Sequence, residues 1–503
     1  MSQFRLGTRR PAPSLLAIRL WASAIRLWAP RLREPRLWEP RLWAPRLLAL
    51  FFLAYGGTGV MAIACLMPPF QAADETNHAD RADQIAGLGL LGLRQGGDTA
   101  GGIVDLGLDR ASAAFDRLRF HPEIKTTRAM ADQAAAADWR PRGPLAFPNT
   151  AIYPPFFYLP GALGILVGKH AGLSVLNTLL LARLVSGGVS VLIAAVAIGM
   201  AGGMAPLLFT VLCLPMSLAL FASVSQDGPM IAASALGVAL LGAPTGRSRL
   251  AVACVAVCLV AMARPAYLPL ALIPALLWDN SWHRAAWRRR LVLAASTTVP
   301  VVGWIMLTGA VTLPHVTSAH TSQQIQALLA NPGLAERIVV NTLARQVQEG
   351  GPYFREFVGV LGWLDTTLPN PYYAVTGIIL IVATLAVILE PGTAPKPGPR
   401  PAPGPPGNAS LLPMLLNGVL LVAAIVAVFV LEYLSWSPIG GGIVEGVQGR
   451  YFLPIALFLP LALPRRPEGH LARAAPIAII LLLYPAVSLA LTLRAIVMRY
   501  YLG

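Results

Sequence analysis

An acidic pair, an imidazole and a guanidinium follow the first long apolar run of the chain, within the stretch PPFQAADETNHADR (residues 68–81). On a helix, positions four and seven residues apart share a face, so Asp74, His78 and Arg81 are expected to lie together. A carboxylate here, from Asp74 or from Glu75, would act as a general base. The imidazole and the cation would contact the substrate, and the cation would hold an anionic leaving group.

Helix capping explains some of the same residues without any chemistry. The pattern after the two prolines predicts a helix over residues 75–93. Asp74 is a natural N-cap for that helix, and Glu75 suits its first turn. Ion pairs three or four positions apart are also ordinary on a helix surface. The sequence leaves the catalytic and the capping interpretations open.

A second carboxylate, Asp227, lies in the short polar sequence SVSQDGP (residues 223–229) between two apolar runs. It would either take part in the chemistry or cap the helix that begins after it. Arg264 and Arg450 are expected at the same level. They would either pair with a phosphate group or extend toward solvent from the ends of their helices.

Trp363 and Asp365 belong to FVGVLGWLDTTLP (residues 357–369), which is too polar at its end to be a membrane span. We expect this segment to pack against the site or to line a groove for an acceptor molecule. The chain has no Cys and His residues at the spacing of a metal site. No cofactor is therefore assigned, and a divalent metal ion stays an open alternative.

The elements that must position these residues are predicted to be membrane helices. Apolar residues make up 56% of the 503 residues and charged residues only 12%, whereas soluble domains carry about 25% charged residues. A helix needs roughly 20 apolar residues to cross a bilayer, and the alternation typical of barrel strands is absent. The composition predicts an all-α integral membrane protein with about 11 transmembrane helices.

The net charge of +16 does not indicate a nucleic-acid partner, because the arginines lie in short blocks between apolar runs. Such blocks are typical of cytoplasmic loops. The arginine blocks fall on the cytoplasmic side if the segment YPPFFYLPGALGILVG (residues 153–168) lies in the membrane interface and does not cross the membrane. The predicted spans are then Leu47–Met67, Asn177–Met200, Met204–Ala222, Pro229–Leu241, Leu250–Ala263, Ala266–Trp278, Leu291–Val311, Tyr373–Leu389, Leu411–Leu434, Tyr451–Leu463 and Ala474–Leu493.

This topology divides the chain into three parts. Residues 1–46 form a basic cytoplasmic tail with a five-residue repeat that ends in proline. The membrane domain covers residues 47–494, and residues 495–503 form a C-terminal tail. The membrane domain has a large first periplasmic loop with juxtamembrane helices, a second periplasmic loop and a cytoplasmic Pro/Gly linker (residues 68–174, 312–372 and 391–410).

The ordered motifs PPFQAADETNHADRADQI, YPPFFYLPGALGILVG, SVSQDG, GWLDTTLP and VQGRYFLP resemble a bacterial domain-of-unknown-function family of polytopic membrane proteins. The resemblance covers roughly Leu47 to Leu493. Ala73 stands where that family often has proline, and Thr76-Asn77 where Pro-Ala is common. Neither departure removes the acidic pair, His78 or Arg81.

That family in turn looks like the GT-C glycosyltransferases, which carry a catalytic carboxylate in the first periplasmic loop. The resemblance implies a multi-pass protein of a bacterial inner membrane with a cytoplasmic N-terminus. It also implies transfer of a sugar from a polyprenyl-phosphate-linked donor to a glycan or lipid acceptor. Asp74 would be the base, Glu75 the close alternative, and Asp227 would orient the acceptor or a metal. Arg81, Arg264 and Arg450 would contact the phosphate.

Two other functions stay open. A transporter or flippase of lipid-linked sugars predicts charges near the bilayer midplane and internal repeats of the spans. Arg183 and Glu432 lie closer to the ends of their spans than to the middle, and no repeat of the spans is evident. A non-catalytic envelope-assembly protein predicts that loss of the carboxylates leaves function intact.

Overall fold

Long apolar helices form the body of the protein. The structure is a computed structural model and describes residues 45–96, 98–242, 246–277, 284–313, 315–389, 411–464 and 475–502. Most of the basic repeat tail, the Pro/Gly linker and the basic residues around 465–473 lie outside these ranges. Within the described ranges, six helices are long and apolar enough to cross a membrane: α2 (Pro45–Leu66), α8 (Val175–Met200), α14 (Arg284–Val311), α18 (Asn370–Leu389), α19 (Leu411–Ser435) and α21 (Ala475–Tyr500).

The predicted count of about eleven spans is not confirmed. The predicted span 204–222 is bent by 78° between α9 (Ala205–Leu212) and α10 (Pro215–Phe221), and counting this pair as one span gives seven among the described residues. Four other predicted spans are helical but short of the roughly 20 residues that a straight crossing needs. They correspond to α11 (Asp227–Leu241), α12 (Arg247–Ala263), η6–α13 (Pro265–Leu277) and η7–α20–η8 (Gly449–Ala462).

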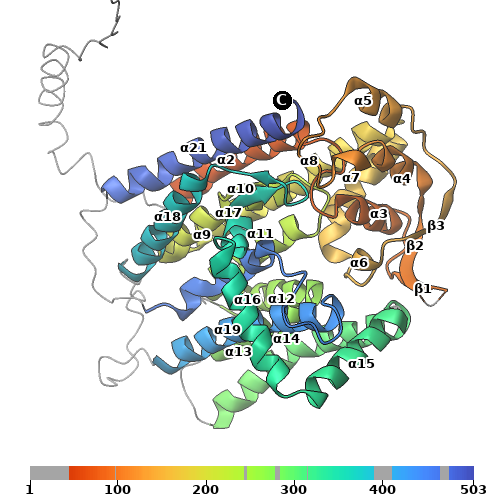
Figure 1. The fold of residues 1–503 in the computed structure, drawn as a ribbon. Helices are drawn as coiled ribbons and strands as arrows, with labels where there is room; N and C mark the ends of the chain where they lie inside the picture. The colour runs from red at the N-terminus through yellow and green to blue at the C-terminus, as the bar shows by residue number, and fades with distance from the viewer. Residues whose placement is uncertain are drawn as a thin grey trace, which may run out of the picture.

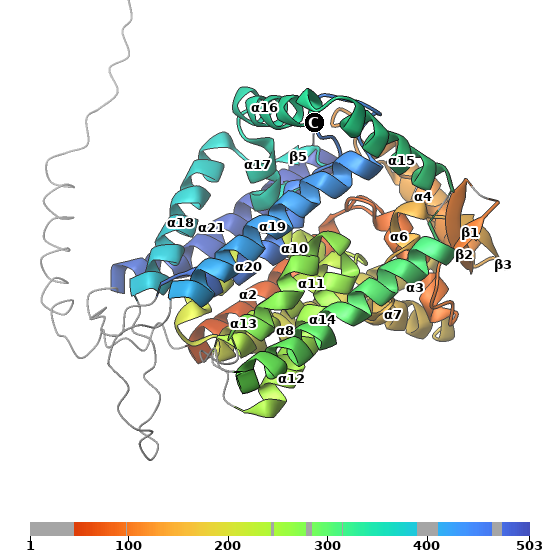
Figure 2. The same cartoon turned by 90° about the horizontal axis from the view of Figure 1, so that it is seen from below.

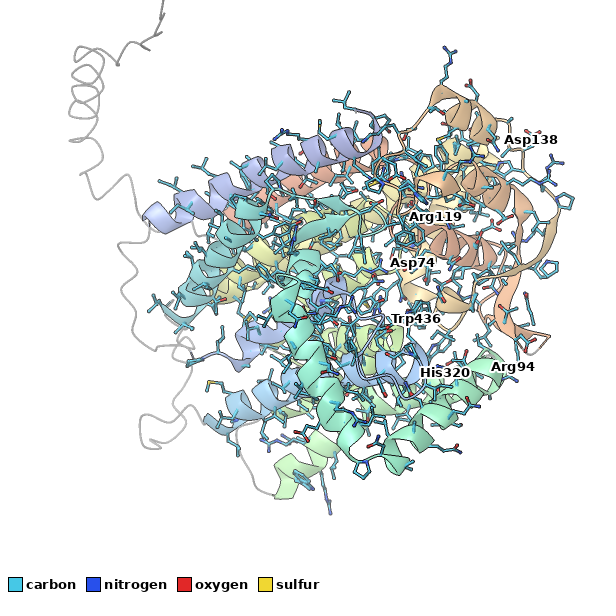
Figure 3. All side chains as sticks on the ribbon, viewed as in Figure 1. Asp74, Arg94, Arg119, Asp138, His320 and Trp436 are labelled. Carbon is cyan, nitrogen blue, oxygen red and sulfur yellow. The ribbon has the colours of Figure 1, made fainter. Side chains whose placement is uncertain are left out.

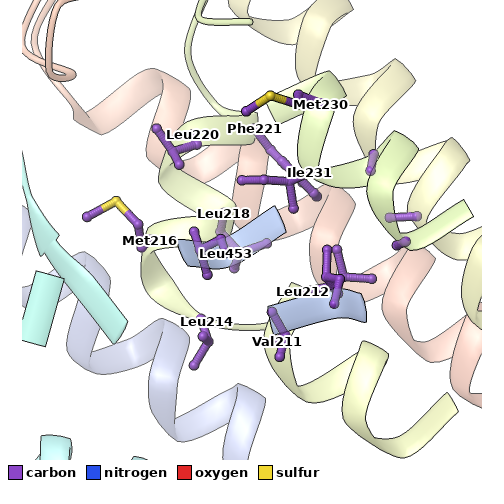
Figure 4. Packing of buried hydrophobic residues seen from close by; sticks show 14 of the residues in the cluster. Val211, Leu212, Leu214, Met216, Leu218, Leu220, Phe221, Met230, Ile231 and Leu453 are labelled. Carbon is purple, nitrogen blue, oxygen red and sulfur yellow. The ribbon is translucent and has the colours of Figure 1, made fainter. Parts of the chain in front are cut away.

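The bend between α9 and α10 lies in the centre of the core. Leu214 is extended and Pro215 begins α10, because proline cannot continue the preceding helix. Figure 4 shows the apolar side chains packed around this break, with Leu453 of α20 (Leu453–Phe458) among them. Residues on both sides of the break are almost fully buried, for example Leu212 and Leu218. A broken helix at this depth is tolerated because protein rather than lipid surrounds it.

Short helices and a small sheet make up the segment from residue 68 to residue 174. The first of them, α3 (Glu75–Ala86), ends well before the predicted residue 93, because the chain turns at Gly87. The other elements are α4 (Leu106–Ala113), η3 (Asp116–Leu118), α5 (Arg128–Ala135), α6 (Pro148–Ala151), η4 (Phe156–Tyr158), α7 (Leu159–His170) and an antiparallel sheet of β1 (Leu93–Gln95), β2 (Thr99–Asp105) and β3 (Arg142–Ala146). The sequence did not predict this sheet. At twelve residues, α7 is shorter than a membrane span.

A largely buried ion-pair network joins the sheet of this segment to α3 and α7. The Nζ of Lys169 lies 2.6 Å from Asp83 and 3.1 Å from Asp105, and Arg142 lies 3.2 Å from Asp83. The Lys169 ammonium also lies 4.3 Å from the centre of the Trp139 ring. Figures 1 and 2 show α3 to α7 and the sheet gathered at one end of the long helices.

The segment from 312 to 372 lies at the same end of the bundle in Figure 2. It contains α15 (His315–Ala330), α16 (Gly333–Gln348), α17 (Pro352–Gly359) and a hairpin of β4 (Val360–Leu361) and β5 (Thr366–Thr367). Arg94 Nε donates a 2.8 Å hydrogen bond to the carbonyl of Leu313, and Thr312 donates one of 2.6 Å to the carbonyl of Gly92. The two loops that the sequence assigned to one side of the membrane are therefore in contact.

The last turn of α21 closes this end of the molecule. The predicted C-terminal tail begins in this helix, which continues to Tyr500. Arg499 donates hydrogen bonds to Asp365 after β4 and to the carbonyls of Leu118 and Ile124 in the first loop. The carbonyl of Tyr500 accepts a further bond from Thr126. The end of α21 thus links the hairpin to the first loop.

Candidate functional site

Two arginines and two aspartates from four separate parts of the chain meet where the first loop begins. Arg450 Nη2 donates a 2.6 Å hydrogen bond to Asp74 Oδ2, and Arg264 Nη2 donates one of 3.2 Å to Asp227 Oδ1. Arg450 Nη1 lies 4.0 Å from Asp227 Oδ2, which joins the two pairs. We refer to these four residues as the arginine cluster. The predicted proximity of Asp74, Asp227, Arg264 and Arg450 is what the structure shows.

Neither aspartate caps a helix with its side chain. Asp74 occupies the N-cap position of α3 with a left-handed backbone (φ 60°), but its carboxylate makes no capping hydrogen bond. The N-cap of α11 is Gln226, whose side chain makes no capping hydrogen bond, and it is the Ser225 hydroxyl that accepts the N–H of Asp227. The capping interpretation of Asp74 and Asp227 is therefore wrong, because both carboxylates turn to the arginines instead. A left-handed non-glycine residue costs about 1–3 kcal/mol, and such residues concentrate at functional sites.

Tyrosine rings surround the guanidinium groups. Arg264 lies between α12 and η6, and its Cζ is 4.0 Å from the centre of the Tyr451 ring. Arg450 lies at the start of η7, 5.7 Å from the same ring. The Tyr267 hydroxyl donates a 2.6 Å hydrogen bond to the Tyr451 carbonyl and so fixes this residue. Arg264 also lies 6.0 Å from the Tyr153 ring, within reach of a cation–π contact.

The cluster is buried, but its hydrogen bonding is incomplete. The side chains of Arg450 and Asp227 are 3% and 4% exposed, whereas that of Asp74 is 28% exposed. Among the described residues, the buried Nε of Arg264 and that of Arg450 have no hydrogen-bond partner. Buried guanidinium groups are normally satisfied, so both arginines can still donate to an acceptor such as a phosphate oxygen.

The arginines keep both carboxylates ionised. Burial raises the pKa of Asp74, but Arg450 outweighs that effect and brings the pKa below its ordinary value. Burial likewise raises the pKa of Asp227, and Arg264 and Arg450 together lower it below its ordinary value. The cluster therefore carries two positive and two negative charges at neutral pH. Asp74, as the more exposed carboxylate, is the one that can accept a proton from a bound molecule.

His78 lies beside the cluster as a neutral imidazole. Its Nδ1 is 2.7 Å from the Tyr158 hydroxyl, and its Nε2 is 3.3 Å from the hydroxyl of Ser225, which in turn accepts the Asp227 N–H. Burial, with Arg450 and Arg264 nearby, lowers the pKa of His78 to about 4 against the attraction of Asp227 and Asp74. His78 therefore connects Tyr158 to the Asp227 turn without adding charge.

Comparison with known proteins gives the family of the chain. A family model described as "Predicted membrane protein (DUF2142)" matches residues 59–459. The chain belongs to this family. The match contains all four residues of the arginine cluster, and the family description agrees with the six long apolar helices. No curated protein and no solved structure matches the chain.

Three predicted site residues of this DUF2142 member lie apart from the cluster. Both oxygens of Glu75 bind Arg183, at 2.8 and 2.5 Å, and the pair is almost completely buried. The Arg81 guanidinium donates to the Gln84 side chain and to the carbonyls of Gly89, Leu90 and Tyr153. Asp365 binds Arg499 at 2.7 Å, beneath the hairpin. These groups bind partners within the protein, and only the Nε of Arg81 has none among the described residues.

Trp363 lies close to Asp74, as expected of a residue beside the site. Its Nε1 donates a 3.3 Å hydrogen bond to the carbonyl of Phe70, and both Trp363 and Asp74 line one cavity. Four residues beside the cluster were not predicted as site residues: Tyr153, Tyr158, Ser225 and Tyr451. The aromatic YPPFFY motif suggested an interfacial segment and the family resemblance but no role in a site, although its first and last tyrosines border His78.

The residues do not form a metal site. Among the described residues, no group of three or more His, Cys, Asp or Glu side chains could hold a metal ion. Asp74 and Asp227 each face an arginine, and a cation would have to displace that arginine to reach them. The open alternative of a divalent metal ion beside Asp227 therefore does not fit these side chains.

Proposed function

We propose that the protein is a glycosyltransferase that takes a sugar from a polyprenyl-phosphate-linked donor and passes it to a glycan or lipid acceptor. We place it in a bacterial inner membrane, with its N-terminus in the cytoplasm and the arginine cluster at the periplasmic face. The observation that carries the proposal is the pair of buried arginines beside two ionised carboxylates, each arginine having an Nε–H without a partner in the part of the chain that the structure describes.

The arginines suit a phosphate leaving group. A guanidinium presents several donors in a planar fork that matches phosphate oxygens, and low exposure strengthens the attraction. Arg264 and Arg450 come from the ends of short helices, close to where a lipid-linked phosphate would lie at the membrane surface. The Tyr451 and Tyr153 rings beside them give the amphipathic surroundings that lipid headgroups meet at an interface.

These groups are sufficient for the sugar transfer. The acceptor hydroxyl gives its proton to the Asp74 carboxylate while its oxygen forms a bond to the anomeric carbon of the donor sugar. The bond from that carbon to the phosphate oxygen breaks, and its electron pair leaves with the lipid phosphate. Arg264 and Arg450 hold the negative charge of the departing phosphate. Asp227 keeps Arg264 in place, and Glu75 serves to position α3 through Arg183 rather than as a base.

Sugar transfer from radiolabelled polyprenyl-phosphate sugars into lipid or polymer fractions tests this proposal, using membranes that contain the full chain. We expect Asp74→Asn to lower transfer by about 100-fold or more, as loss of a general base does. Asp132→Asn is the matched control, because Asp132 lies exposed on α5 in the same loop. Transfer that persists in Asp74→Asn would contradict the assignment. Absence of transfer from every donor, with Asp74→Asn still complementing a deletion strain, would overturn the enzyme proposal.

A further inference from the structure

A polar cavity is lined by Asp74 but by neither arginine of the cluster. Its volume is about 290 Å³, close to the lower end of small-molecule sites at ~300 Å³. Figure 3 shows two of its residues, Asp74 and Arg119, next to each other. The lining residues come from α3, α4, η3, β3, α6, the residues beside these elements and the β4–β5 hairpin, and they include Asp74, Asp80, Asp109, Asp116, Arg119 and Trp363.

Asp80 gives this cavity an unsatisfied polar group. The side chain is only 2% exposed, and its Oδ1 has no hydrogen-bond partner among the described residues. Burial, with Asp109 and Asp83 nearby, raises the pKa of Asp80 well above its ordinary value. A buried polar atom without a partner costs about 1–3 kcal/mol. A ligand hydroxyl in the cavity removes that cost by donating a hydrogen bond to the unsatisfied oxygen.

Trp363 supplies an apolar surface in the same cavity. Arg119 lies 4.7 Å from the centre of its ring, and Phe120 packs edge-on at 5.6 Å. The hydrogen bond from Nε1 to the Phe70 carbonyl fixes the orientation of the indole. A rigid aromatic face beside several hydroxyl, amide and carboxyl groups suits a ring that has an apolar face and polar edges, as sugars do.

The charges in the cavity disfavour an anionic ligand. Four aspartates line it against one arginine. Asp116 is paired with Arg119 at 2.8 Å and Asp74 with Arg450 at 2.6 Å, so Asp80 and Asp109 are the remaining acidic groups of the lining. A carboxylate or phosphate on the ligand would lie close to these aspartates. Like charges brought together across a binding surface cost several kcal/mol. The cavity therefore selects a neutral or amino-bearing polyol.

We propose that this cavity is the acceptor subsite and that it takes a polyhydroxylated, non-anionic sugar. The inference rests on the proposed function. One acceptor hydroxyl meets Asp74, a second bonds to Asp80, and the apolar face of the ring packs on Trp363. Asp74 then lies between the acceptor and Arg450, because its Oδ2 binds Arg450 while the residue lines the cavity. This is the place that a base for the acceptor hydroxyl must occupy.

Ligand-observed NMR tests the inference, using the full chain in lipid nanodiscs. The probes are maltotriose, cellotriose, chitotriose, mannotriose and galactotriose, with trigalacturonate as the anionic comparison. We expect saturation transfer to at least one neutral trisaccharide, and none to trigalacturonate. Asp80→Leu and Trp363→Ala should each weaken binding at least tenfold. Asp80→Asn should stay within threefold of wild type, since the amide oxygen still accepts a hydrogen bond. Asp132→Asn is the control, and melting temperatures identify variants that do not fold.

The outcomes separate the subsite from the proposed function. Three results would overturn the subsite proposal. These are equal binding of trigalacturonate, unchanged binding in Asp80→Leu and Trp363→Ala, and no binding of any neutral trisaccharide. Binding of undecaprenyl phosphate is measured in parallel by the shift in melting temperature. If the lipid phosphate binds and the sugars do not, the subsite fails while the proposed function stands. If the sugars bind as expected and the lipid phosphate does not, the cavity is a sugar site and the donor assignment fails.

Discussion

Asp74 and Glu75 are neighbours in the chain, but different arginines bind their carboxylates. Asp74 Oδ2 accepts from Arg450 at 2.6 Å, whereas Glu75 accepts from Arg183 of α8 at 2.5 and 2.8 Å. The left-handed backbone of Asp74 turns the two side chains apart. The two residues therefore differ in role: the first is partly exposed beside a cavity, and the second is sealed against a membrane helix.

The Glu75–Arg183 pair should control stability rather than catalysis. Arg183 also donates to the carbonyls of Ala64, Met67 and Pro68, so it holds the end of α2. Glu75→Gln leaves this buried cation without its counter-charge, and we expect the free energy of unfolding to fall by about 3–5 kcal/mol. Melting temperature in nanodiscs measures the effect.

A surface pair provides the control for that experiment. Arg345 and Glu349 lie 2.8 Å apart but are about half exposed, and exposed pairs contribute roughly 0–1 kcal/mol. Glu349→Gln should therefore leave the melting temperature almost unchanged. The double variant Glu75→Met with Arg183→Met should recover part of the loss, because no buried charge remains unpaired. A Glu75→Gln melting temperature equal to that of wild type would show that the pair is not structural.

Replacing either cluster arginine with lysine should weaken binding of the lipid phosphate. Lysine keeps the charge but lacks the planar fork and the Nε–H that is unpartnered among the described residues. We expect Arg264→Lys and Arg450→Lys each to reduce affinity for undecaprenyl phosphate about tenfold, the loss of about one charge-assisted hydrogen bond. Arg128→Lys, on the exposed face of α5, serves as the control. Wild-type affinity in both cluster variants would argue that the phosphate lies elsewhere.

His78 should make the fold sensitive to mild acid. Its pKa of about 4 in the folded state lies below the ordinary value of 6.5. Between these values the unfolded chain binds a proton that the folded chain does not, so stability falls as the pH is lowered from 6.5 to 4. The expected loss is on the order of 3 kcal/mol. Melting temperatures across this range should fall less steeply in His78→Gln. The exposed His170→Gln should keep the wild-type slope, and a matching slope in His78→Gln would refute the prediction.

Close contact between α7 and α8 depends on Gly164. A Cβ at this position would lie 2.5 Å from Ala182 Cα, and because that atom belongs to the backbone, α7 would have to shift. Gly164→Ala should lower the free energy of unfolding by about 1–3 kcal/mol. Gly188→Ala in α8 is the control, since nothing lies within 4 Å of its added Cβ. Chemical unfolding of both variants tests the difference, and equal midpoints would show that α7 adapts without cost.

The sequence predicted the long helices because their signal is local. Runs such as 177–200 and 411–434 are apolar throughout, and the structure places α8 and α19 there with ends within about two residues. The prediction of membrane spans from the sequence failed at the bend between α9 and α10 and at the four short helices. In those places neighbouring helices replace lipid around the backbone, so the length needed to cross a bilayer no longer constrains the segment.

The arginine cluster was predictable only in part. Asp74, Asp227, Arg264 and Arg450 could be named from polar turns at the ends of apolar runs. Which arginine binds which carboxylate depends on side-chain directions that spacing does not fix, and Glu75 shows this most clearly. Arg81 was misleading. Helical periodicity places it near His78, but it does not predict which carbonyls surround its guanidinium. The unsatisfied oxygen of Asp80 has no sequence signal at all.

The hydrogen bonds of Arg499 set an order on biosynthesis. They reach back 381 positions to Leu118 and 375 positions to Ile124. The ribosome completes the first loop long before it reaches this arginine, so a nascent loop must hold its shape by the Lys169 network and its own sheet. The η3 segment, which ends at Leu118, is fastened to α21 only when translation of α21 is finished. A chain that stops before α21 therefore lacks the hydrogen bonds that join the first loop to the hairpin at Asp365.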